Sequence, residues 1–411
     1  MKFNKRLLFL LLAIILGLVL TACGSEEASK KEEEVKEEEK TDEKSNEEKE
    51  DEKKEEDKEI SSATMTDGEI FNPAIEEQSG GTVEHVFTNN NPGYENDIDG
   101  LHVKVNGYQI VKVTDANESE KYILDDSLEG YVVTADVTIE NTLDKDVKFN
   151  AGMFIQLEDR YNYVQSNMNY YIPEDKKIKW ENSDDFGTYE PGSIRNGYVT
   201  FSMTTDEYER LQQVEPKFVI EAGASFNDDF SDSFGNDAVF DFVYSAEQGE
   251  KVASAPKFYQ DQLTTENIAT KEMIFEDLDL NESQELDKFK LTIEGVQYTT
   301  ITPNETSKER FSNFGDDELV AMTLKINIDN QSDVLVYNGT GGILVANDNE
   351  ARILNQGMVE NTDKREINPG ETAEHYMVFL FEKKYFDIYE EFSLEIGPFL
   401  GEDGYVLKER K

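Results

Sequence analysis

The stretch that decides the fold is Leu101–Val113, which reads LHVKVNGYQIVKV. Its first apolar residues, Leu101, Val103 and Val105, alternate with polar residues at a period of two. This is the pattern of a β-strand with one buried face. A second run of this kind, YVVTADVTIEN, follows at residues 131–141. Both runs are rich in β-branched and aromatic residues, which favour strands. The sequence around Leu101 therefore predicts β structure.

The same stretch occurs twice in the chain. Residues 81–114 align without a gap with residues 269–302, at an offset of 188, and seven positions are identical. Further along, Asn141 matches Asn330, and Pro191-Gly192 matches Pro369-Gly370 before another alternating run. Two strand patterns in the same order are the signature of an internal repeat. We therefore expect two related domains.

The domain organisation follows from these patterns. About seven short strands per repeat, each with one apolar face, predict an all-β fold of two tandem β-sandwiches built from antiparallel sheets. We place the first at residues 80–247 and the second at residues 262–411, after a signal peptide at 1–22 and a disordered stalk at 23–60. One short helix is expected in each repeat, because Thr204-Thr205-Asp206-Glu207 has a capping-box pattern.

The N-terminus reads as an export signal. Lys2, Lys5 and Arg6 precede an apolar run from Leu7 to Leu20, which is short for a spanning helix. Leu20-Thr21-Ala22-Cys23 resembles a bacterial lipobox, in which the chain is cut before the cysteine and the thiol takes a lipid. We expect a lipoprotein anchored through Cys23 to the extracellular face of the cell membrane. The alternative is an uncleaved spanning helix with an incidental cysteine.

The stalk and the charge limit the classes of partner. Residues 26–59 are almost all Glu, Lys and Asp, and such a stretch cannot bury enough apolar surface to fold. The net charge of the chain is −49. The three N-terminal cations contribute +3 and the stalk −10, which leaves −42 on residues 60–411. This charge argues against nucleic acid and favours a cationic partner, divalent cations, or solubility alone.

The repeats also resemble a known family. In each repeat a strand ends in an acidic residue and Asn (Glu140-Asn141 and Asp329-Asn330), and an inner strand with an acidic turn follows (154–159 and 343–348). Pro-Gly and a further alternating strand come next. This order is similar to the telokin-like, immunoglobulin-like domains of Gram-positive surface lipoproteins, a family of unknown function. The resemblance covers most of residues 80–225 and 268–400. It implies two tandem immunoglobulin-like antiparallel β-sandwich domains and carries over no catalytic residue.

The sequence contains no recognisable catalytic constellation. The three histidines, His85, His102 and His375, lie in separate strand patterns, whereas zinc needs three or four neighbouring ligands. The single cysteine, Cys23, is expected to carry the lipid. Neither a nucleophile elbow nor a phosphate-binding loop is present, and no pair among the many carboxylates stands out as glycosidase-like. We therefore expect a protein that is not an enzyme and has no cofactor.

Two acidic stretches are candidates for weak structural calcium. One contains Asp228, Asp229 and Asp232, and the other contains Asp277 and Asp279. The second begins like a calcium loop, D-x-D-x-N, but Glu282 stands at the position of the turn glycine. Plain surface loops are the alternative.

An insertion distinguishes the two repeats. Asn150 and Pro191 are 41 residues apart, whereas the matching Asn338 and Pro369 are 31 apart. The longer segment is aromatic, and aromatic side chains beside polar ones are typical of binding faces. Our candidates for partner binding are Tyr161, Tyr163, Tyr170, Tyr171 and Trp180. The alternative is that these rings cap an open edge of the sandwich.

The functional prediction is a non-enzymatic binding or scaffolding module at the cell envelope, whose partner is an envelope or secreted protein. Two alternatives stay open. One is a small-ligand or cell-wall glycan module that uses the aromatic insertion, and the other is a calcium-stabilised spacer.

Overall fold

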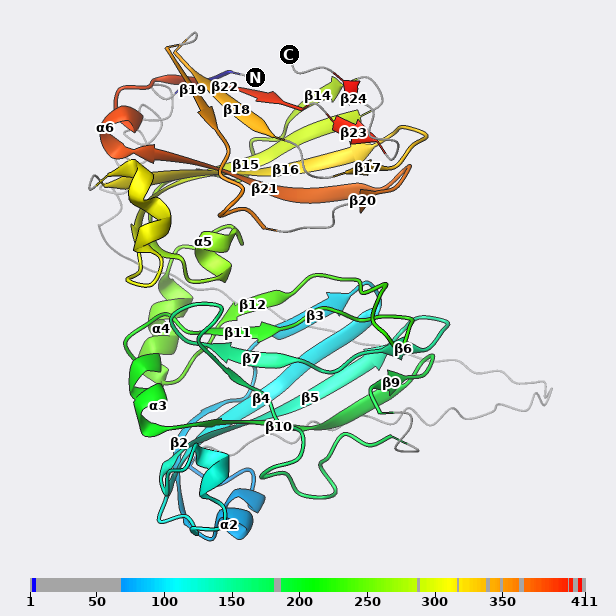
Figure 1. The fold of residues 1–411 in the computed structure, drawn as a ribbon, viewed down its shortest axis with the longest axis vertical. Coiled ribbons are helices and arrows are strands. Elements are labelled where there is room, and N and C mark those ends of the chain that lie inside the picture. Colours follow the sequence, from blue (N-terminus) through cyan, green and yellow to red (C-terminus); the bar gives the residue numbers. More distant parts are fainter. Residues whose placement is uncertain are drawn as a thin grey trace, which may run out of the picture. The chain divides into compact units, whose positions relative to one another are not determined.

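The fold is known from a computed structural model, which describes residues 2–4, 68–180, 186–286, 289–315, 318–337, 341–347, 350–361, 366–397, 399–401 and 406–408. The chain is mostly β, with antiparallel sheets in two groups (Figure 1). The prediction of two tandem antiparallel sandwiches is confirmed. Cys23, the stalk and nearly all of the predicted signal peptide lie outside the described residues. In the described part, no helix is both long and apolar enough to cross a membrane.

The first sandwich contains two main sheets. One has the order β10 (Ile194–Met203), β5 (Gly130–Asn141), β4 (Leu101–Thr114) and β2 (Thr82–Asn89), and β3 (Tyr94–Ile98) also pairs with β4. The other has the order β12 (Ala238–Asp241), β11 (Lys217–Ile220), β7 (Met153–Gln156) and β8 (Tyr163–Gln165). A small sheet pairs β6 (Val147–Lys148) with β9 (Thr188–Tyr189).

The second sandwich repeats this plan. Its long sheet has the order β13 (Ala269–Asp277), β15 (Phe289–Pro303), β16 (Leu319–Asn330) and β21 (Thr372–Glu382), with β14 (Glu282–Leu286) beside β15. A further sheet has the order β1 (Lys2–Asn4), β22 (Glu391–Ile396), β18 (Gly342–Ala346) and β19 (Ala351–Leu354). The last has the order β20 (Glu366–Ile367), β17 (Val336–Tyr337), β23 (Phe399–Gly401) and β24 (Val406–Lys408).

Short helices connect the strands. They are α2 (Ala74–Ser79), η1 (Lys121–Leu124), α3 (Thr205–Leu211), α4 (Ala246–Ser254), α5 (Gln262–Thr265), η3 (Lys308–Phe314) and α6 (Lys383–Phe386). The predicted capping box is confirmed at α3. The Thr204 hydroxyl accepts from the Glu207 amide, and the Glu207 carboxylate accepts from the Thr204 amide at 2.8 Å. Two backbone donors at the start of α3 are thereby satisfied.

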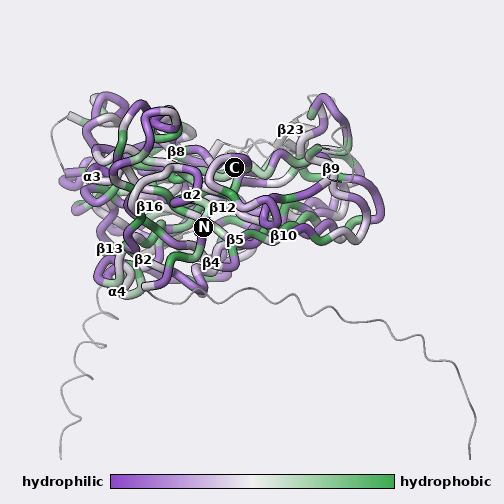
Figure 2. The backbone as a smooth tube through the Cα atoms, turned by 90° about the horizontal axis from the view of Figure 1, so that it is seen from below, coloured by the Kyte–Doolittle hydropathy of each residue, from purple (hydrophilic) through white to green (hydrophobic). Residues whose placement is uncertain are grey.

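The period-two pattern explains the core of the first sandwich. Leu101, Val103 and Val105 are buried on β4, and they pack in one cluster with residues of the opposite sheet such as Ile155 and Phe218. Each such side chain contributes about 1.5–3 kcal/mol when it leaves water. In Figure 2, hydrophobic stretches run along strands such as β5 and β10, whereas the outer turns are mostly hydrophilic.

The repeats also share their irregularities. The pairing of β4 with β5 shifts register just before Gly107, and the pairing of β15 with β16 shifts just before Gly295. A Cβ atom on Gly295 would come within 2.7 Å of the Asp277 carbonyl oxygen. Glycine is therefore required here by the close approach of two backbones.

Candidate functional site

The five aromatic residues predicted as a binding face divide into exposed and buried groups. Tyr161, Tyr163 and Tyr170 are exposed, with relative accessibilities of 83%, 47% and 42%. Tyr171 is fully buried at 0%. The inclusion of Tyr171 in a partner-binding face is corrected by this burial, because a ring buried in a cluster with Ile75 and Val111 cannot contact a partner.

Trp180 is half-buried and packs against the core of the first sandwich. Its ring lies 4.6 Å from the ring of Phe186, and the Arg195 guanidinium lies 5.9 Å from its centre. Trp180 therefore contributes to packing at the side of the sandwich, and the exposed tyrosines provide most of the accessible aromatic surface.

The segment 167–172 covers the edge of strand β10. Asn167 and Thr200 exchange two backbone hydrogen bonds, of 2.7 and 2.9 Å. The Thr200 hydroxyl also donates to the Tyr170 carbonyl at 2.9 Å. An edge strand offers unpaired backbone groups, and these contacts satisfy some of them while fixing the position of Tyr170.

Tyr171 adopts a backbone conformation that is rare for a bulky residue. Its φ angle is 57°, which costs on the order of 1–3 kcal/mol. Helix α2 and Asn72, two residues before it, hold this conformation. The Tyr171 amide donates to Gln78 at 2.8 Å, and the Tyr171 carbonyl accepts from Asn72 at 2.7 Å. The chain turns here so that Tyr171 points inward and Tyr170 remains exposed.

A sixth aromatic residue, Tyr122, lies beside Tyr170 and was missed by the sequence reasoning. Tyr122 lies on η1 and is 56% exposed. Its ring centre is 5.7 Å from that of Tyr170, and the ring planes are inclined at 79°. Desolvation, followed by the nearby Glu120 carboxylate and Tyr170 hydroxyl, raises the pKa of Tyr122. The two rings are 48 residues apart, so no local pattern could have paired them.

The candidate calcium residues act as local hydrogen-bond and ion-pair partners. Asp228 pairs with Lys148 at 2.8 Å, Asp229 accepts from the Ser231 amide at 3.1 Å, and Asp232 accepts from the Ser225 hydroxyl. In the other stretch, Asp277 accepts from the Asp279 amide at 3.2 Å. Among the described residues, no three His, Cys, Asp or Glu side chains lie close enough together to hold a metal. Calcium binding stays a prediction.

The three histidines lie in three different strands. His85 Nε2 is 2.9 Å from the Thr88 hydroxyl, His102 Nδ1 is 3.6 Å from Asp97, and His375 Nε2 is 3.8 Å from Glu360. Each histidine has its own local partner, and the structure does not bring the three together.

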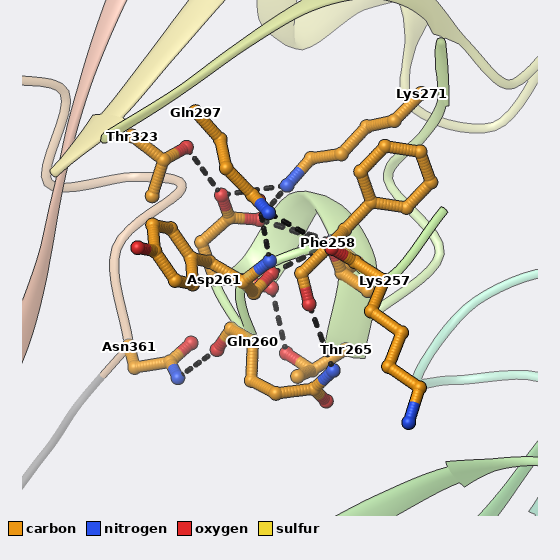
Figure 3. Close-up of polar contacts among 11 residues, drawn as sticks. Lys257, Phe258, Gln260, Asp261, Thr265, Lys271, Gln297, Thr323 and Asn361 are labelled. Atoms are coloured by element: carbon orange, nitrogen blue, oxygen red, sulfur yellow. Dashed lines mark hydrogen bonds and ion pairs between the residues drawn. The ribbon is translucent and has the colours of Figure 1, made fainter. Parts of the chain in front are cut away.

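A buried polar cluster fastens the chain segment before the second sandwich (Figure 3). The Lys271 ammonium lies 2.6 and 2.7 Å from the two carboxylate oxygens of Asp261, and the Thr323 hydroxyl donates to the same carboxylate at 2.8 Å. The two charged side chains are 3% and 0% exposed. Burial lowers the pKa of Lys271, and the Asp261 carboxylate opposes this effect. The Gln297 amide binds the backbone of Lys257 and Tyr259, each at 2.8 Å.

The first repeat has the same fastening without the charges. Gln109 binds the backbone of Glu69 and Phe71, each at 2.8 Å, and Asn72 donates to the Thr134 hydroxyl at 3.0 Å. Asn72 thus takes the place of Asp261. In the aligned sequence, Val83 takes the place of Lys271. Since the neutral Asn72 and Thr134 perform the same task in the first repeat, the ion pair has a structural role in the second.

Comparison with known proteins finds one family that matches part of the chain, and the function of that family is unknown. Residues 52–245, which include the first sandwich, match a family described as "Domain of unknown function (DUF5068)". No curated protein matches the chain.

Several solved structures are similar to parts of the chain. A functionally unknown protein from Listeria monocytogenes EGD-e shares 19% identity over 42% of this chain and 93% of its own, with a TM-score of 0.35. A conserved hypothetical protein from Bacillus anthracis shares 16% identity over 33% of this chain and 97% of its own, with a TM-score of 0.23. An uncharacterized beta-sandwich protein from Clostridium difficile 630 shares 14% identity over 29% of this chain and 85% of its own, with a TM-score of 0.21. These matches identify neither a telokin-like nor a lipoprotein family, so that resemblance stays a prediction.

Proposed function

We propose that this protein is a lipid-anchored, non-enzymatic binding or scaffolding module that captures a protein partner at the outer face of the cell membrane. The observation that carries the proposal is the display of Tyr161, Tyr163 and Tyr170 on the first sandwich. Tyrosine is enriched where proteins bind one another, because it offers a large contact area together with a polar group.

The difference between the repeats supports a role in binding. In the second sandwich the segment 356–361 lies against β21 as 167–172 lies against β10, since the Gln356 amide donates to the Val378 carbonyl at 2.8 Å. That segment carries Met358 and the buried Val359 and has no tyrosine. The exposed rings are therefore not needed to build the fold.

The anchor and the stalk support the location. The lipobox-like sequence ending at Cys23 and the charged stretch 26–59 would tether the sandwiches to the membrane and hold them away from it. The resemblance to telokin-like domains of Gram-positive surface lipoproteins is consistent with this location.

The test is chemical cross-linking on intact cells, followed by purification of the full chain and identification of its partners. The variant Tyr161→Ala/Tyr163→Ala/Tyr170→Ala removes the exposed rings. The matched control, Tyr385→Ala/Ile388→Ala, removes exposed apolar side chains of the second sandwich. We expect one defined partner with the native chain and with the control, and at least a tenfold lower yield with the triple variant.

Equal capture by all three proteins would overturn the role of the three exposed tyrosines in binding. The absence of a defined partner would overturn the proposal. Recovery of cell-wall glycan with the native chain, lost in the triple variant, would favour the glycan-binding alternative instead.

A further inference from the structure

Tyr122, Tyr170 and Glu120 form one exposed corner of the first sandwich, which we call the aromatic corner. The two rings stand at 79° to each other with their centres 5.7 Å apart. Desolvation, followed by the half-buried Glu120 carboxylate, raises the pKa of the Tyr122 and Tyr171 hydroxyls. Two nearly perpendicular aromatic faces beside a carboxylate are the chemical elements that recognise an organic cation.

The aromatic corner is held in place by the fold. Tyr170 is presented outward because Tyr171, the next residue, is turned inward at a φ angle of 57° and bonded to Asn72 and Gln78. The Tyr171 hydroxyl is buried and has no hydrogen-bond partner among the described residues. Strain of this kind persists only where the surroundings impose it, and it is concentrated at functional sites.

The second repeat lacks this corner. The turn bonds from Glu120 to Asn117 and from Ile123 to Glu120 recur as bonds from Ser307 to Asn304 and from Arg310 to Ser307. In this register Glu309 stands where the first repeat has Tyr122. In the alignment of 167–172 with 356–361, Glu360 stands at the position of Tyr171 and does not have a positive φ. The fold can therefore be built without the tyrosine pair and without the strained turn.

The aromatic corner has no cation of its own among the described residues. Other rings of this sandwich do have one, since Arg160 lies 5.5 Å from the ring of Tyr161 and Lys176 lies 5.3 Å from the ring of Tyr198. The neighbouring Lys121 is paired with Glu118 at 3.5 Å. The described part of the chain therefore leaves this corner open to a cation.

We propose that the aromatic corner binds a lysine or arginine side chain in a basic segment of the protein partner. The inference rests on the proposed function and specifies the chemistry of the partner. The net charge of −42 on residues 60–411 attracts a basic chain over long range. The corner then provides the short-range contact, in which Tyr122 and Tyr170 offer their faces and Glu120 its negative charge.

The test measures binding of a lysine–glycine repeat peptide to the full chain in detergent by titration calorimetry. The same peptide with Nε-acetylated lysines keeps the stems but loses the charge. Tyr122→Ala/Tyr170→Ala removes both rings of the corner without changing the charge. Tyr385→Ala/Ile388→Ala removes two exposed apolar side chains of the second sandwich and is the matched control.

We expect the lysine peptide to bind and the acetylated peptide not to bind. The Tyr122/Tyr170 variant should bind the lysine peptide roughly 3- to 30-fold more weakly, and the Tyr385/Ile388 variant should bind it like the native chain. Circular dichroism checks that both variants keep the fold. The single variant Glu120→Gln should also weaken binding of the lysine peptide and make that binding less dependent on salt.

Two outcomes would overturn the inference. Equal affinity of both double variants would mean that the acidic surface as a whole attracts the peptide, and binding of the acetylated peptide would mean that no cation is recognised. If cross-linking on cells still captures a partner that depends on the exposed rings, the proposed function stands and only cation binding by the aromatic corner is excluded. If no partner is captured while peptide binding depends on Tyr122 and Tyr170, the proposed function alone fails.

Discussion

At the scale of single residues, the repeated asparagine shows why some identities recur and others do not. Asn141 donates to the carbonyls of Lys145 and Tyr189, and Asn330 donates to those of Val334 and Ile367. Both side chains are fully buried. A buried amide that satisfies several backbone groups leaves them unpaired when it is removed, which costs about 1–3 kcal/mol for each group. The identity of Asn141 and Asn330 therefore marks a structural requirement of the fold.

The buried ion pair gives a prediction at this scale. Asp261→Asn leaves the Lys271 ammonium buried without its carboxylate, and we expect a loss of about 3–5 kcal/mol in the free energy of unfolding. Asp261→Asn/Lys271→Val installs the residue types of the first repeat, Asn72 and Val83, and should recover most of the loss. Urea unfolding followed by circular dichroism measures both effects.

Trp180 provides an internal control for this experiment, because it is the only tryptophan and lies in the first sandwich. Its fluorescence transition should be the same in all variants. A double variant no more stable than Asp261→Asn would contradict the comparison between the repeats.

At the scale of elements, α2 and the segment 167–172 form one unit. The Gln78 side chain holds both sides of the strained turn, since its oxygen accepts from the Tyr171 amide and its nitrogen donates to the Ile172 carbonyl at 3.4 Å. The strands β4 and β5 do not depend on Gln78, because their hydrogen bonds run between each other and their neighbours. The turn can therefore open locally without unfolding the sandwich.

We predict that Gln78→Ala loosens the turn and leaves the sheet unchanged. Loss of these hydrogen bonds should speed amide hydrogen exchange in residues 167–172 by roughly 2- to 10-fold, with no change in β4 or β5. The neighbouring exposed Glu77→Ala is the control. Uniformly faster exchange throughout the first sandwich would show that the turn and the sheet are not separate units.

At the scale of the whole molecule, buried tyrosines link stability to alkaline pH. Burial raises the pKa of Tyr108 to about 12, with smaller opposing effects from its hydrogen bonds. Desolvation also raises the pKa values of Tyr171, Tyr208 and Tyr259 to about 12. In the unfolded chain a tyrosine titrates near 10. Between pH 10 and pH 12 the unfolded state loses protons that the native state keeps, so stability falls as the pH rises.

The expected result is a class of tyrosines that ionises only as the chain unfolds. Absorbance at 295 nm should show this late class above pH 10, together with loss of the β signal in circular dichroism. In urea all tyrosines should titrate in one step near pH 10. A single step near pH 10 in the native protein, with the β signal intact, would contradict the burial of these hydroxyls.

Much of the fold was predictable because its determinants are local. The period-two alternation of β4 and β5 and the capping box of α3 each depend on residues close together in sequence. The repeat at an offset of 188 residues predicted the second sandwich from the sequence alone. Short-range sterics and backbone hydrogen bonding decide such features, so the sequence by itself determined the all-β class and the repetition of the strand patterns along the chain.

The candidate site depended on contacts between distant residues. The sequence showed an aromatic segment between Asn150 and Pro191, but only the tertiary structure buried Tyr171, exposed Tyr170 and brought Tyr122 beside it. It also gave segment 167–172 a counterpart at 356–361, so the extra residues of the first repeat fall after Ile172. Exposure and pairing are set by packing between segments far apart along the chain, and no local periodicity encodes that packing.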